Sequence, residues 1–280
     1  MAISNFISTV WSETLYEELD KQYVAVRNCN REFDGDIKGQ GDRVKICGVG
    51  AIDIFDYTKD SNLSYTQTLT DTSVDLVINR ARAFNFQIDD IDRAQSNPKL
   101  MKAAMKVAAA ALANDADEYI FSLYEKISDE NTVKCSGITA ENIVDQIIAA
   151  REKLFLGNVS NNDEIVIEVS PAIASLILKA KISLSNDVSD TALSSGVLGT
   201  IAGCKIYVSN NVQLRYDSDA TYHECFMRTK RAIAFAEQLS EINAYRPESR
   251  FADAVKGLHL YGADIIYPKE IVLLDLGFTL

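Results

Sequence analysis

Residues 97–126 read NPKLMKAAMKVAAAALANDADEYIFSLYEK, and this stretch decides the fold. Asn97 is a good N-cap, and Pro98 suits the first helical position because its missing N–H is not needed there. Neither glycine nor proline interrupts the run after Pro98, so we expect one helix of roughly 43 Å at ~1.5 Å per residue. A compact chain of 280 residues has a diameter of only ~50 Å, so this spine helix crosses most of the molecule. Apolar side chains recur along it every three or four residues, at Met101, Met105, Ala108, Leu112, Ala116, Tyr119 and Leu123.

The charges of the spine helix run against its dipole. Lys99, Lys102 and Lys106 lie near its N-terminus, and acidic residues gather towards its C-terminal half. The dipole favours the reverse order by ~0.3–1 kcal/mol per charge. Two interpretations stay open: a solvated face that tolerates this cost, or a face that meets complementary charges on neighbouring subunits.

Before the spine helix, the hydrophobic pattern has a period of two. Apolar and polar residues alternate along residues 42–56 and 63–80, and the polar cluster at residues 56–62 separates the two runs. This pattern predicts a long antiparallel hairpin, out along the first run and back along the second. Two strands cannot bury a face by themselves, so the hairpin must lie on something else, and its edges invite pairing with another chain.

The remaining segments mix helices and strands without a regular βαβ alternation, which favours the α+β class. An amphipathic helix near the N-terminus carries an apolar stripe, made of Trp11, Leu15, Leu19 and Tyr23. We expect further helices at residues 139–157 and 171–180. Strands are expected at residues 165–169, 204–209, 223–228, 232–236, 255–267 and 271–276.

Composition excludes several classes of protein. The formal charge of −12 disfavours a nucleic-acid-coating protein and a peripheral membrane binder, because both need basic surface. No apolar run is long enough for a transmembrane helix, and no secretory signal is visible at the N-terminus. The five cysteines have no short spacing, so we expect reduced thiols. The two histidines make His-based catalysis or a multi-His metal site improbable.

Three short segments partly resemble catalytic or binding motifs, but each lacks a residue that the motif requires. Gly48-Val49-Gly50 lacks the third glycine of a dinucleotide fingerprint. His223-Glu224-Cys225 offers a base and a thiol without a third partner, and Asp89, Asp90 and Asp92 lack the glycine turn of a calcium loop. We therefore expect no catalytic, cofactor or metal site and no enzymatic activity. A soluble α+β enzyme with dispersed carboxylates stays open as an alternative.

Several short segments, taken in order, resemble one family over essentially the whole chain. They are FDGDI (33–37), GDRV (41–44), DYT (56–58), IDDIDRAQ (88–95), VSNN (208–211), AYRPE (244–248) and FADAVKGLH (251–259). Together with the order of the predicted elements, they resemble the major capsid protein of tailed bacteriophages, which has the Hong Kong 97-type fold. None is a catalytic motif, and their specificity lies in their order and number.

The resemblance implies an α+β chain with an N-terminal arm, an extended hairpin loop that lies on a neighbouring subunit, and two lobes. The arm corresponds to residues 1–34 and the loop to residues 35–85. The peripheral lobe corresponds to residues 86–182 and 246–280 and contains the spine helix. The axial lobe, which gathers around fivefold and sixfold axes, corresponds to residues 183–245.

The resemblance also implies partners. We expect pentamers and hexamers that close into an icosahedral head shell around double-stranded DNA, without sequence-specific binding and without a membrane. The acidic balance suits a shell that must not hold its DNA tightly. A portal and a separate scaffolding protein are expected partners, with assembly in the host bacterial cytoplasm and the virion as final location. An encapsulin-like nanocompartment shares the fold and stays open as an alternative.

Candidate residues for contacts between subunits come from exposed or projecting segments. Some members of the family crosslink a loop-tip lysine to an asparagine of a neighbour. Lys59 lies near that position, but no matching asparagine or activating acid is found, so we expect no crosslink. The chain begins almost at the arm, so we expect no large maturation cleavage. The interface candidates are Trp11, Phe55, Tyr57, Lys59, Tyr65, Lys99, Lys102, Arg246, Glu248 and Arg250.

Overall fold

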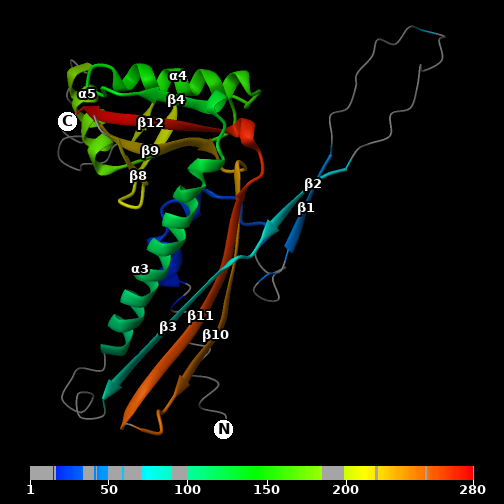
Figure 1. The fold of residues 1–280 in the computed structure, drawn as a ribbon, viewed down its shortest axis with the longest axis vertical. Helices are drawn as coiled ribbons and strands as arrows, with labels where there is room; N and C mark the ends of the chain where they lie inside the picture. Colours follow the sequence, from blue (N-terminus) through cyan, green and yellow to red (C-terminus); the bar gives the residue numbers. More distant parts are fainter. Residues whose placement is uncertain are drawn as a thin grey trace.

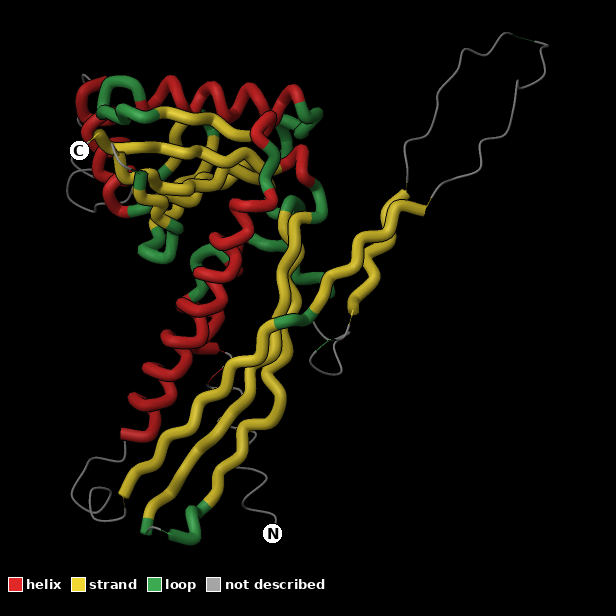
Figure 2. The backbone as a smooth tube through the Cα atoms, viewed as in Figure 1, coloured by secondary structure: helices red, strands yellow, loops and turns green. Residues whose placement is uncertain are grey.

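A long helix, two sheets and a projecting hairpin make up the computed structural model of the chain (Figures 1 and 2). It describes residues 15, 17–33, 41, 43–49, 59, 71–89, 100–184, 199–217, 220–249 and 251–279. Residues 17–22 are helical and belong to the N-terminal helix. The helices with described bounds are η1 (Val26–Asn28), α3 (Leu100–Phe121), η2 (Ser122–Lys126), η3 (Asp129–Asn131), α4 (Ile143–Leu156), α5 (Pro171–Leu184) and η4 (Pro268–Glu270). The strands are β1 (Arg43–Val49), β2 (Asp71–Val77), β3 (Arg80–Asp89), β4 (Thr132–Cys135), β5 (Ile165–Val169), β6 (Thr200–Ile201), β7 (Cys204–Val208), β8 (Leu214–Tyr216), β9 (Ala220–Thr229), β10 (Ile233–Tyr245), β11 (Ala252–Ile265) and β12 (Ile271–Thr279).

Helix α3 is the predicted spine, with a different C-terminal end. The helix ends at Phe121, and residues 122–126 continue as the 3-10 helix η2. Phe121 and Leu123 are both buried, and the tighter turn packs both side chains into the core. The predicted cap at Asn97 and Pro98 lies outside the described residues. The buried face of α3 is shifted slightly from the predicted stripe and includes Met105, Ala109, Leu112, Ala113, Ala116 and Ile120.

A three-stranded antiparallel sheet runs beside α3 in the order β10-β11-β3 (Figure 1). Strand β10 extends to Tyr245, although the sequence predicted a strand only at residues 232–236. Its pairing with β11 shifts register between Ser240 and Asn243. This irregularity interrupts the alternation of apolar and polar residues that would have indicated a strand in the second half of β10. The second half is therefore defined by its hydrogen bonds to β11 and not by a local sequence pattern.

The upper lobe is built on a seven-stranded mixed sheet in the order β4-β12-β9-β5-β7-β6, with β8 paired to β9 (Figure 1). The predicted strand at residues 165–169 is β5, and all five of its residues are buried. The predicted helices are α4 and α5. Ser170 accepts the N–H of Ile173 at 3.4 Å with its side-chain oxygen, which caps α5 where Pro171 opens it.

Strands β1 and β2 form the base of the predicted hairpin and lead away from both sheets (Figures 1 and 2). They pair in register from Arg43 with Val77 to Val49 with Asp71. Paired residues are therefore equidistant from residue 60, which lies within the turn cluster predicted from the sequence.

The sheets do not follow the expected lobe boundaries. Strand β5, expected in the peripheral lobe, pairs with β7 and β9, which were expected in the axial lobe. Strand β10, expected in the axial lobe, pairs with β11 beside the spine. Residues 80–85 of the expected loop belong to β3. The sequence-based boundaries followed changes in local pattern, whereas hydrogen bonding between distant strands decides which segments share a sheet.

None of the helices in the described part of the chain is both long and apolar enough to cross a membrane.

Candidate subunit interface

The hairpin is fixed to the body at its base. Val44, Ile46 and Leu76 are buried in a small cluster with Ala234, Ala236 and Leu260 of the three-stranded sheet and with Ile78. At Gly262 the backbone approaches so closely that a Cβ would overlap with the carbonyl oxygen of Val77. The hairpin therefore leaves the body along a packed hinge.

Most predicted loop residues cannot be placed. Lys59 is an exposed turn residue. Phe55, Tyr57 and Tyr65 lie outside the described residues, as does Trp11 of the N-terminal helix. The rest of that helix's apolar stripe, Leu15, Leu19 and Tyr23, is buried.

The segment that follows the N-terminal helix is tied to the seven-stranded sheet by a buried ion pair. Arg228 on β9 and Glu168 on β5 are completely buried, and the guanidinium donates to both carboxylate oxygens at 2.8 and 2.9 Å. It also donates to the carbonyl oxygens of Ala25 and Asn28, at 3.0 and 2.6 Å. Because an unpaired buried charge is costly, this pair fixes where the segment enters the body.

Asp117 of α3 holds the same segment from the other side. Its carboxylate accepts the backbone N–H groups of Val24, Ala25 and Val26 at 2.9–3.0 Å. Burial raises the pKa of Asp117 to about 6, although these three donors stabilise the ionised form. The sequence left open whether the acidic half of the spine helix is solvated or meets neighbouring subunits; Asp117 does neither, because it is buried inside the chain.

Glu237 on β10 connects the segment to the three-stranded sheet. It accepts hydrogen bonds from Tyr23 Oη and Arg31 Nη2, both at 2.5 Å, and lies 2.8 Å from Nε2 of His259. Burial alone raises the pKa of Glu237, but the contacts with His259 and Tyr23 outweigh it, so its pKa lies below the usual range. His259 thus contacts Glu237, and the ring of His223 packs edge-on against Phe278.

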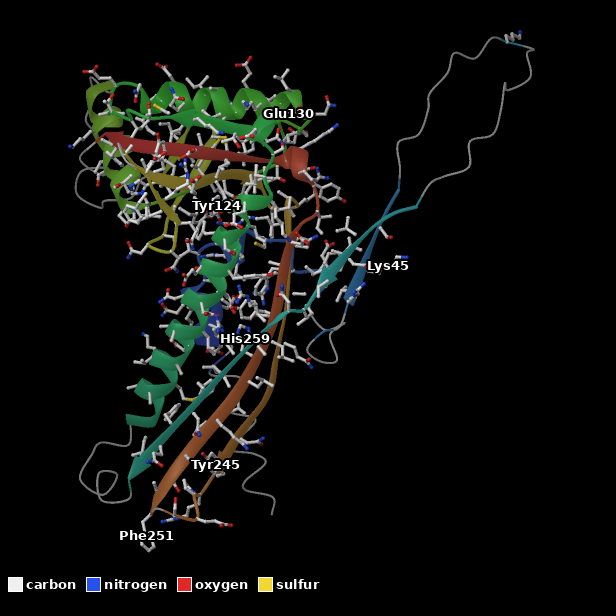
Figure 3. The ribbon with its side chains drawn as sticks, in the orientation of Figure 1. Lys45, Tyr124, Glu130, Tyr245, Phe251 and His259 are labelled. Carbon is white, nitrogen blue, oxygen red and sulfur yellow. The ribbon has the colours of Figure 1, made fainter. Side chains whose placement is uncertain are left out.

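The far end of the three-stranded sheet is an exposed tip. Phe251 is 81% exposed at its very end, and Tyr245 lies farther up the same end of the sheet (Figure 3). Arg246 and Glu248 are exposed in the connection between β10 and β11. Arg250 and Lys99 lie outside the described residues, and so does the side chain of Lys102, whose backbone is part of α3. The structure thus places only two of the predicted interface residues close together.

A groove of about 740 Å³ opens beside the edge strand β4 and was not predicted. On its floor, Asp275 of β12 pairs in register with Lys134 of β4 on one side and with Glu224 of β9 on the other. Arg215 of β8 bridges the two carboxylates, with Nε 3.0 Å from Glu224 and Nη2 2.6 Å from Asp275. Lys134 turns away to Asp129, at 2.7 Å. The sequence carried no signal for this row, because its members come from four strands.

The groove has an excess of buried negative charge. Burial raises the pKa of both Glu224 and Asp275, and their mutual repulsion raises that of Glu224 further. Among the described residues, no group of three or more potential ligands is arranged to hold a metal ion.

Burial also raises the pKa of the Cys29 and Cys225 thiols, which lie outside the groove, to about 12, so neither is a reactive nucleophile.

No protein-family model matches the sequence. No curated protein matches it significantly either. Many solved structures do match. A structure from Mycobacterium phage Che8 is 29% identical, with a TM-score of 0.70 over 90% of this chain and 91% of that one. The capsid structure of Cyanophage P-SCSP1u is 14% identical, with a TM-score of 0.66 over 89% of this chain and 86% of that one. The chain has the fold of tailed-phage capsid proteins.

The predicted α+β capsid fold is thereby confirmed. A virus-like particle from Pyrococcus furiosus shares this capsid fold at 12% identity, with a TM-score of 0.58 over 94% of this chain and 97% of that one.

Proposed function

We propose that this chain is the major capsid protein of a tailed bacteriophage and that its copies assemble into an icosahedral head shell around double-stranded DNA. The observation that carries the proposal is the match, over about nine-tenths of each chain, to the phage Che8 structure and to the capsid structure of Cyanophage P-SCSP1u. A closed shell needs many identical contacts, and each contact can be weak because every subunit makes several of them.

The architecture supports self-assembly. The hairpin base packs on the body, yet the two strands lead away from both sheets (Figure 1). A two-stranded ribbon is marginally stable alone and its edges are open for pairing. We propose that it lies on a neighbouring copy, with Phe55, Tyr57, Lys59 and Tyr65 near the contact.

The lobes are assigned differently from the sequence-based division. We propose that the seven-stranded lobe is the axial lobe. Its strands form one continuous hydrogen-bonded sheet, and the helices α4 and α5 belong to the same lobe. The spine helix α3 with β3, β10 and β11 would form the peripheral lobe, and its exposed tip at Phe251 would meet other copies.

Electron microscopy tests the proposal directly. The chain is expressed alone and together with candidate scaffolding proteins, and the purified material is analysed by light scattering and negative-stain microscopy. We expect rings or closed shells; a stable monomer under all conditions, at 30.9 kDa, overturns the proposal. A portal and a scaffolding protein are the partners we propose, with the virion as the final location.

An encapsulin-like compartment is the second candidate, favoured only by the likeness to the Pyrococcus furiosus particle. That likeness is at 12% identity and carries the fold alone. The contents of particles made in the native host separate the two: packaged DNA supports the phage shell, and a cargo enzyme supports the compartment.

A further inference from the structure

The groove beside β4 contains two incompletely bonded carboxylates. The side chains of Glu224 and Asp275 are only 2% and 5% exposed, and Arg215 bonds one oxygen of each. The other oxygens, Oε2 of Glu224 and Oδ1 of Asp275, are buried without a hydrogen-bond partner in the described part of the chain. A buried acceptor left unpaired costs ~1–3 kcal/mol, so a donor that enters the groove gains by bonding these oxygens.

The surroundings of these oxygens favour a cationic partner. The groove is lined by four acidic residues and two basic ones, so it is negative overall; the acidic residues are Glu125, Asp129, Glu224 and Asp275. The rings of Tyr124 and Tyr222 also line it, and aromatic faces attract ammonium and guanidinium groups. At 40% and 62% exposure, the side chains of Arg215 and Lys134 have room to rearrange when a further cation enters.

A surface of opposite charge lies on the other side of the same lobe. A cavity of about 340 Å³ there is lined by four basic residues against two acidic ones. Lys205 is paired with Glu164 at 2.7 Å, and Arg231 is paired with Glu270 at 2.7 Å and lies 3.5 Å from Asp163. Arg27 and Lys230 are exposed and form no ion pair within the described residues. We define Arg27, Lys205, Lys230 and Arg231 as the basic cluster.

The sheet order separates the two surfaces. The groove is built on β4, β12, β8 and the first half of β9, whereas the basic cluster lies around β5, β7 and the turn after β9. Strand β4 is one edge of the sheet, and β7 is next to the other edge. Complementary surfaces at opposite edges of one lobe suit a head-to-tail contact, and such contacts close into rings when the rotation between copies allows it.

We propose that the acidic groove of one copy receives the basic cluster of the next copy, so that each ring of subunits is joined by repeated acidic-to-basic contacts. This inference rests on the proposed function. Lys230 or Arg27 of the neighbour supplies the donors that the free oxygens of Glu224 and Asp275 lack. Charge complementarity of this kind mainly sets the rate and the specificity of association.

Charge reversal at two exposed positions tests the contact without disturbing the buried pair. Glu125→Lys removes an acid from the groove, Lys230→Glu reverses the basic cluster, and the double variant exchanges the two charges. Glu152→Lys on α4 and Lys179→Glu on α5 are matched controls, because both residues are exposed and form no ion pair with a described residue. Assembly is followed by light scattering and microscopy at low and high salt.

We expect each single reversal to slow assembly at low salt by about tenfold or more, and the double variant to recover most of the loss. The difference between variants and wild type should shrink at high salt, where charges are screened. The control variants should assemble like the wild type.

The contact is disproved if the double variant is no better than the single ones, or if the controls fail equally. Wild-type shells with unaffected variants overturn this inference alone, whereas a wild type that never assembles overturns the proposed function. Unfolding midpoints verify that each variant is folded, and Glu125→Gln with Lys230→Gln replace any variant that is not; these are expected to weaken the salt dependence of assembly.

Discussion

The side chain of Arg228 on β9 is buried. Its hydrogen bonds to Glu168, Ala25 and Asn28 take the place of the hydrogen bonds to water that it loses on burial. The pair with Glu168 joins two neighbouring strands, and the two carbonyls belong to the segment that crosses beneath them. One side chain thus couples the seven-stranded sheet to the N-terminal segment.

We predict that Arg228→Met destabilises the folded chain by about 3–5 kcal/mol, because Glu168 is left buried and unpaired. Denaturant unfolding of the unassembled chain measures the loss. Adding Glu168→Gln should recover part of it, since the isolated charge is removed. Arg231→Met, at an exposed position, is the control and should cost less than about 1 kcal/mol. A similar loss in both single variants would contradict the prediction.

Asp117 should make stability depend on pH. Its pKa is about 6 in the folded chain and ~3.9 when unfolded. The folded state therefore holds the proton more tightly. Protonation of Asp117 therefore adds up to about 3 kcal/mol to the unfolding free energy. This stabilisation is fully present below the unfolded pKa and is lost as the pH rises through the folded pKa.

Asp117→Asn removes this titration. We expect the difference in unfolding free energy between wild type and variant to shift in favour of the wild type by about 2 kcal/mol between pH 7 and pH 4, and by about 3 kcal/mol once the pH is well below ~3.9. Unfolding curves measured at several pH values test this. Glu118→Gln, at the exposed neighbouring position, should leave the pH dependence of the unfolding free energy unchanged. If both variants show the same pH dependence, it does not come from Asp117.

At the scale of elements, the hinge of the hairpin depends on a glycine in β11. A Cβ at Gly262 would overlap with the backbone of Val77 and Ile78, which cannot move without displacing β2. At Gly257 the added Cβ would meet only the Phe84 ring, at 2.5 Å, and a side chain can rotate away.

We therefore predict that Gly262→Ala costs about 1–3 kcal/mol and that Gly257→Ala costs less. Thermal or denaturant unfolding compares the two. Because the hairpin base packs on Gly262, proteolysis between residues 43 and 77 should also become faster in Gly262→Ala alone. Equal stabilities would show that β2 does not need this close approach.

The hairpin itself should be needed for assembly and not for folding. Val49 and Asp71 are paired, so residues 50–70 can be replaced by an Asn-Gly turn that suits a two-residue hairpin connection. We expect this variant to keep its unfolding free energy within about 1 kcal/mol, because the cluster at the hairpin base stays intact. It should form no closed shells by microscopy. Normal shells would mean that the loop makes no essential contact.

At the scale of the whole molecule, the net charge of −12 is unevenly distributed. The described part of the chain combines an acidic groove with a basic cluster on one lobe. Overall acidity weakens the hold on enclosed DNA, while the local contrast gives copies a direction in which to join. Net charge alone could not distinguish these two effects.

The same scale gives a prediction about covalent links. Lys59 has no matched asparagine or activating acid in the sequence, so neighbouring subunits should stay unlinked. Assembled particles boiled in detergent should run as a single band at 30.9 kDa. A ladder of higher bands that Lys59→Arg abolishes would show that the crosslink forms.

Sequence patterns predicted most elements because periodicity is a local property. The spine helix, the hairpin base, β5 and α5 all have strong patterns within ten to thirty residues. Strand β10 was predicted too short, since its second half crosses an irregular register with β11. The predicted lobe boundaries separate β5 from its partners for a related reason: nothing near β5 in the sequence shows that these partners are β7 and β9.

The sequence by itself determined the order of elements, and with it the α+β capsid fold, because each element is specified by its own residues. Only the tertiary structure decided which charges meet. Lys134, Asp275 and Glu224 lie far apart in the chain and become neighbours through the register of three strands. Register is fixed by burying whole faces of a sheet, so a local pattern carries no record of it, and the candidate contact between copies emerged only there.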